Sequence, residues 1–173
     1  MLRALVNLSR GFVLAVALAA ASGAAVASDV IQQIKLSEPK IESFIAAQKD
    51  MAKVAEKMQG TASEKPEPSH QKELDMVAAK HGFKDFAEFD DVAANVLMIM
   101  AGIDPANGTF TDPVDSIKKE ITEVTADKTL KEADKKQMLE ELAEALKVTQ
   151  PIQFPENVAL VKMYREKIDA VLQ

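Results

Sequence analysis

The 173-residue chain contains no cysteine and no tryptophan, and aromatic residues make up only 5% of it. Without cysteine the protein can form no disulfide, no thiolate metal site and no lipid attachment through sulfur. Seven phenylalanines and a single tyrosine offer few side chains on which a sugar or a nucleobase could stack. These absences exclude a disulfide-linked fold and argue against a carbohydrate- or base-stacking surface.

Recognisable catalytic motifs are also missing. The chain contains no GxSxG nucleophile motif, no HExxH zinc motif and no glycine-rich phosphate loop. Its two histidines, His70 and His81, would lie about 16 Å apart on one helix, so they cannot share a metal ion. We therefore expect a non-enzymatic protein without cofactor or metal. The alternative is a periplasmic hydrolase whose dispersed carboxylates meet in a cleft, which a sequence does not exclude.

The N-terminal 27 residues predict export. Two arginines precede an apolar run at residues 12–21, and small residues at 25–27 have the pattern that a signal peptidase cleaves. The apolar run is too short to cross a bilayer. We expect residues 1–27 to be a cleaved signal peptide. The remaining residues, 28–173, are then a single helical domain, periplasmic or secreted, with no membrane span after cleavage.

Acidic side chains outnumber basic ones. The chain has 27 Asp and Glu against 21 Lys and Arg, a formal net charge of −6. Loss of the two arginines of the signal peptide leaves 19 basic against 27 acidic residues, a net charge of −8. Nucleic acids and anionic membrane surfaces repel such a protein. We therefore expect no nucleic-acid partner.

The fold class follows from the spacing of apolar residues. Residues recur at helical spacing throughout 28–173, and strand-like alternation is nearly absent. The sequence predicts an all-α fold, a single compact bundle of five to six helices. Capping residues place the helix starts near residues 38, 69, 86, 113, 130 and 156. One of these caps is a capping box between Thr129 and Glu132.

The most apolar stretch is residues 92–103, VAANVLMIMAGI, interrupted only by Asn95 and Gly102. A helix that is apolar on nearly every side is typical of the centre of a bundle. Asn95 is then either an amide satisfied by a backbone carbonyl or a polar anchor in an apolar pocket. The candidate ligand-binding residues are Phe89, Asn95, Met98 and Met100.

Three segments carry a family resemblance: IESFIAAQKDM at 41–51, HGFKDFAEFDDVAANVLMIMAGID at 81–104, and KKQMLEELAEAL at 135–146. Through them the chain resembles small exported helical proteins of uncharacterised function found in proteobacteria. A looser likeness connects it to stress-induced periplasmic helical chaperones. The resemblance implies an exported α-helical domain and carries no enzymatic activity.

Together these features predict a non-enzymatic periplasmic interaction or binding protein. Its partner is either a client protein or a small apolar ligand. A client requires an exposed apolar patch, whereas a small ligand requires an enclosed apolar pocket. The sequence leaves the oligomeric state open, because a charged surface suits a monomer and an exposed stripe on the first or fifth helix suits a dimer.

Overall fold

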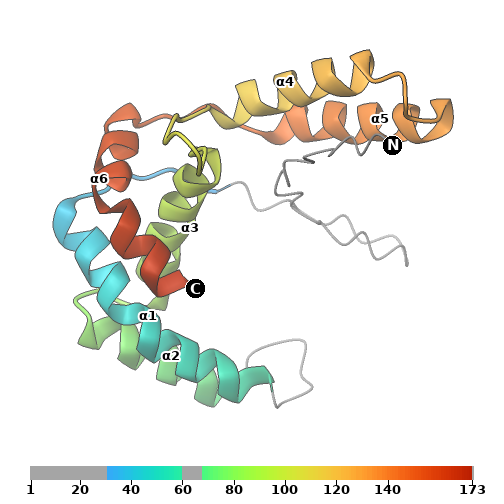
Figure 1. Cartoon of the computed structure of the whole chain (residues 1–173). Helices are drawn as coiled ribbons and strands as arrows, with labels where there is room; N and C mark the ends of the chain where they lie inside the picture. The colour runs from blue at the N-terminus through green and yellow to red at the C-terminus, as the bar shows by residue number, and fades with distance from the viewer. Residues whose placement is uncertain (1–30, 60–67, 173) are drawn as a thin grey trace, which may run out of the picture.

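The computed structural model describes residues 31–59 and 68–172, which form six α-helices and no strand (Figure 1). The prediction of an all-α fold is therefore confirmed. The predicted signal peptide, residues 1–27, lies outside the described residues. The helices are α1 (Glu38–Gln59), α2 (Pro68–Lys80), α3 (Phe86–Gly102), α4 (Pro113–Ala126), α5 (Glu132–Val148) and α6 (Pro155–Leu172).

Helices α1, α2, α3 and α6 form the packed body. α3 contacts each of the other three, and α1 also contacts α2 and α6 (Figure 1). The side chains of Ile41, Phe44, Ile99 and Ile168 are fully buried in their shared core. The central position predicted for residues 92–103 is thus confirmed. The segment is not covered on every side, because Leu97 on its outer face is 45% exposed.

Helices α4 and α5 pack against each other and extend away from the body (Figure 1). Val124 is the one buried residue of α4, and α5 has none. A pair of helices without a third layer cannot cover its apolar residues completely. The apolar residues of the hairpin lie outside the core of the body. Leu139, at the edge of the α4-facing side of α5, stays half-buried, as do the apolar residues on the facing sides of α4 and α5: Ile117, Ile121, Met138, Leu142 and Leu146.

Side-chain caps explain where two of the helices begin. The Asp85 carboxylate accepts a hydrogen bond of 3.0 Å from the Glu88 backbone N–H, as predicted for the start of α3. The Asp112 carboxylate likewise accepts a hydrogen bond of 2.9 Å from the Val114 backbone N–H, and Pro113 lies in the first turn of α4.

The predicted capping box at the start of α5 is wrong. The helix begins at Glu132 after Lys131, which makes no capping bond through its side chain. Thr129 instead donates its backbone N–H and its hydroxyl to Asp127, at 2.7 and 2.6 Å. Asp127 therefore accepts the backbone N–H that a capping box would direct to the Glu132 side chain, and Thr129 belongs to the interhelical turn.

Gly102 fixes the direction in which the hairpin leaves the body. The chain folds back after α3, with an isolated bridge between Ile103 and Phe110 and a bond of 2.8 Å from the Thr111 N–H to the Gly102 carbonyl. A Cβ atom on Gly102 would lie only 2.7 Å from the Thr111 carbonyl oxygen and 2.6 Å from the Phe110 ring. Only glycine allows this approach without displacing the start of α4.

Candidate functional site

Asn95 holds the extended segment 31–37 against α3. Its side chain is fully buried. The Oδ1 atom accepts a 3.1 Å hydrogen bond from the backbone N–H of Ile34. The Nδ2 group donates to the carbonyl of Gln32 at 2.9 Å and to that of Asp91 at 2.8 Å. Both amide protons and one acceptor position are therefore used within the chain, which is the first of the two roles considered for this residue.

Asn157, in the first turn of α6, makes a matching pair of bonds. It is 2% exposed, accepts 2.9 Å from the N–H of Leu36 and donates 2.7 Å to the carbonyl of Ile34. Within the segment 31–37, each asparagine thus binds one carbonyl and the N–H of the residue two positions further on, as a neighbouring β-strand would. Asn157 is absent from the predicted set, although its helical spacing to buried Val161 was a usable signal for an inward polar residue.

The four candidate ligand-binding residues do not face one common space. At 100° per residue, Phe89 and Met100 point within about 20° of each other, and Met98 points about 160° away from Met100. Phe89 is 7% exposed in the core, and half-buried Met100 packs against that core. The structure therefore brings Phe89 and Met100 to the inner side of α3 and places Met98 on its outer side.

The outer side of α3 is apolar and accessible. It is formed by four residues at helical spacing, which we call the α3 face: Ala94, Leu97, Met98 and Ala101. Leu97 is 45% exposed, Ala101 is exposed, and the other two are half-buried. Asp90 is exposed and Asp91 half-buried one turn before this face, so its N-terminal end is acidic.

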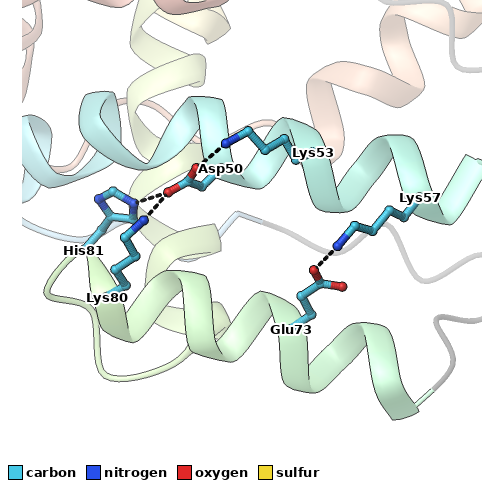
Figure 2. Close-up of polar contacts among 6 residues, drawn as sticks. All are labelled: Asp50, Lys53, Lys57, Glu73, Lys80 and His81. Atoms are coloured by element: carbon cyan, nitrogen blue, oxygen red, sulfur yellow. Dashed lines mark hydrogen bonds and ion pairs between the residues drawn. The ribbon is translucent and has the colours of Figure 1, made fainter.

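A second accessible feature is a groove between α1 and α2 of about 710 Å³. At one end the Asp50 carboxylate accepts hydrogen bonds from Lys80 at 2.7 Å and Lys53 at 2.9 Å, and lies 3.1 Å from His81 Nε2 (Figure 2). The bonds from Lys80 and Lys53, and then that with His81, hold the pKa of Asp50 well below its usual range.

The other end of the groove is crossed by an ion pair between Lys57 of α1 and Glu73 of α2 (Figure 2). Between the two polar ends the lining is apolar, with buried Val54, half-buried Val77 and exposed Met76. Asp50 and Glu73 are both paired with lysines, so their charges bridge the two helices. This arrangement ties α2 to α1.

The pKa shifts of the described carboxyl groups all run in one direction. A general acid needs a raised pKa at neutral pH. Where the pKa of a described carboxyl group is shifted, it is lowered by hydrogen bonds, as for Asp50, Glu88, Asp127 and Glu156. Within residues 31–59 and 68–172, no three His, Asp or Glu side chains are grouped so that they could hold a metal ion. The geometry therefore lends no support to the hydrolase alternative.

The Asp50 cluster predicts an acid-dependent stability. Because the folded-state pKa is lowered, the stabilisation is complete above the unfolded-state pKa, about 3.9, and is lost as the pH falls toward the folded-state value. We expect Asp50→Asn to lower the melting temperature at pH 7, and this deficit to shrink between about pH 4 and pH 2. Melting of both proteins followed by circular dichroism tests this. A deficit of constant size over that range would contradict the ionic role of Asp50.

No protein-family model, curated protein or solved structure matches the chain. The resemblance to exported proteobacterial proteins therefore stays a prediction. Among the helices that the structure describes, none has the length and hydropathy needed to cross a bilayer. The functional argument depends on the surfaces described above.

Proposed function

We propose that the protein is a non-enzymatic periplasmic interaction protein that binds a client through the α3 face. The client segment is apolar and carries basic side chains. The observation that supports this is the exposure of Leu97, together with Met98 and two alanines, on the most apolar of the described helices. An apolar surface left open on a central helix is a feature of protein-binding sites.

Charge defines the chemistry of the client. Asp90 and Asp91 lie at the N-terminal end of the α3 face, and the chain as a whole has a net charge of −6. A segment with lysine or arginine beside its apolar residues is attracted to this surface, and an acidic one is repelled. The two alanines allow a partner backbone to approach α3 closely.

The inner side of α3 favours a client protein over a small apolar ligand. There the Asn95 amide is bonded to Ile34, Gln32 and Asp91. Phe89 is surrounded by other aromatic rings. In the described part of the chain, every buried side-chain nitrogen and oxygen already has a hydrogen-bond partner. None is left for a bound small molecule to satisfy.

The proposal predicts binding of a basic amphipathic peptide. A fluorescein-labelled helical peptide of leucine and lysine is expected to bind the purified protein, as measured by fluorescence anisotropy. A leucine–glutamate peptide of equal length is expected to bind at least tenfold more weakly. Leu97→Lys should weaken binding of the basic peptide by tenfold or more, because it places an ammonium group in the apolar contact and repels the lysines.

Met163→Lys is the matched control, because Met163 is an exposed methionine on α6 at 64% exposure. It should leave the affinity unchanged. Equal binding of both peptides, or equal effects of the two substitutions, would refute the α3 face as the site. Native mass spectrometry adds a second readout. A small molecule retained on the folded protein would indicate that the protein carries a ligand and does not bind a client.

A further inference from the structure

Helix α5 presents a second unpartnered surface, on a side of the molecule that the α3 face does not use. A shallow hollow of about 680 Å³ is lined there by residues of α5 alone. Its centre is half-buried Leu139. We define the α5 stripe as the residues that share this face of the helix at spacings of three and four: Glu132, Lys136, Leu139, Ala143 and Lys147.

The α5 stripe adjoins the side of α5 that packs on α4. The inward residues 138, 142 and 146 centre about 100° around the helix from the middle of the stripe, and Leu139 lies at the border between the two sides. A third helix can therefore pack on the stripe without displacing α4. Adding a helix at this position would bury Leu139, which the hairpin alone leaves half-covered.

The charges of the stripe are self-complementary. Glu132 lies seven residues before Leu139, and Lys147 lies seven residues after Glu140. Consider two antiparallel α5 helices related by a two-fold axis that lies midway between residues 139 and 140 along each helix. Each Glu132 then faces Lys147 of the other copy. Lys136 then faces Ala143 by the same symmetry, and like charges are nowhere directly opposite.

We propose that the α5 stripe binds a second copy of this chain, forming a two-fold symmetric dimer with antiparallel α5 helices. A two-fold interface requires one surface to be complementary to itself, and the order of charge along α5 satisfies this requirement. The two Leu139 side chains meet beside the axis, and the alanines at 143 leave room for the lysine stems. Two hairpins joined in this way form a four-helix layer between the two bodies. The proposal does not depend on client binding at the α3 face.

Charge reversal tests this arrangement, with the dimer dissociation constant measured by sedimentation equilibrium of the purified protein. Glu132→Lys and Lys147→Glu are each expected to weaken the dimer roughly tenfold, because each removes two exposed ion pairs per dimer and opposes like charges. The double substitution restores opposite charges across the axis, and its dissociation constant should return to within about threefold of the original. Both residues are exposed, so none of these changes should unfold the hairpin.

Leu139→Lys provides the second measurement and should weaken the dimer by tenfold or more, while circular dichroism confirms that the helices remain. Met163→Lys on α6 again serves as the control and should leave the dimer intact. A protein that stays monomeric at 100 µM, on the order of a weak dimer's dissociation constant, would overturn the proposal. A dimer that the double substitution fails to restore would overturn the antiparallel α5 pairing.

Discussion

Replacing Asn95 with leucine is expected to lower the free energy of unfolding by about 3 kcal/mol. Leucine has the same branched side-chain shape but cannot bond to the Ile34 N–H or to the Gln32 carbonyl, so both backbone groups lose their partner against α3. An unsatisfied group of this kind costs about 1–3 kcal/mol. Urea unfolding followed by circular dichroism measures the loss.

Two comparisons isolate the role of the amide. Asn95→Asp keeps the acceptor for Ile34 but removes both donated bonds, and buries a charge, so we expect it to destabilise the protein at least as much as leucine does. Gln71→Leu, on the exposed surface of α2, should change stability by less than about 0.5 kcal/mol. A loss below about 1 kcal/mol for Asn95→Leu would show that the amide is not needed for folding and would favour its role as a ligand anchor.

Phe89→Ala is expected to cost about 4 kcal/mol, because it removes the ring around which the core of the body is arranged. Phe89 packs edge-on against Phe83 at 5.4 Å between ring centroids, and stacks with Phe86 at 5.8 Å and Phe44 at 5.9 Å. Its side chain is 7% exposed, so the substitution leaves a cavity that α1 and α3 share. Chemical unfolding of the variant measures the cost.

Phe89→Leu separates burial from ring contact. Leucine keeps most of the apolar volume and loses the aromatic pairs, so we expect about 1–2 kcal/mol for this variant. If Phe89→Ala instead left the stability unchanged and abolished binding of the leucine–lysine peptide, Phe89 would be a contact residue for the client. Its position in the core would then not describe its main role.

The helices could be predicted from the sequence because their signals are local. The Asp112-Pro113 pair and the Asp85 cap act within one turn of the residues that they stabilise, and apolar spacing defines one face per helix. The partner of each face is not a local property. The apolar side of α5 resembles those of α1 and α6 in sequence, yet α5 packs mainly on α4, because Gly102 and the turn after it direct both helices away from the body.

The environment of Asn95 shows the same limit. A single amide in an apolar helix indicates that some polar group must face it, but the groups in question are backbone atoms of Gln32 and Ile34. Every residue carries such atoms, so no pattern in residues 31–37 distinguishes them. The spacing of Met98 and Met100 was more informative, because residues two positions apart on a helix point about 160° away from each other.

The two asparagines bind the main chain of residues 32–36 and make no hydrogen bond to its side chains. Gln32 and Lys35 are exposed, whereas the Leu36 side chain is buried at 4% exposure. Leu36 therefore has to place its side chain in the core and its backbone N–H at Asn157 at the same time. Substitutions at 32 and 35 therefore leave the bonding pattern intact. Loss or gain of one residue would put every donor opposite the wrong partner and Leu36 on the wrong side. We therefore expect this segment to tolerate changes in composition far better than changes in length.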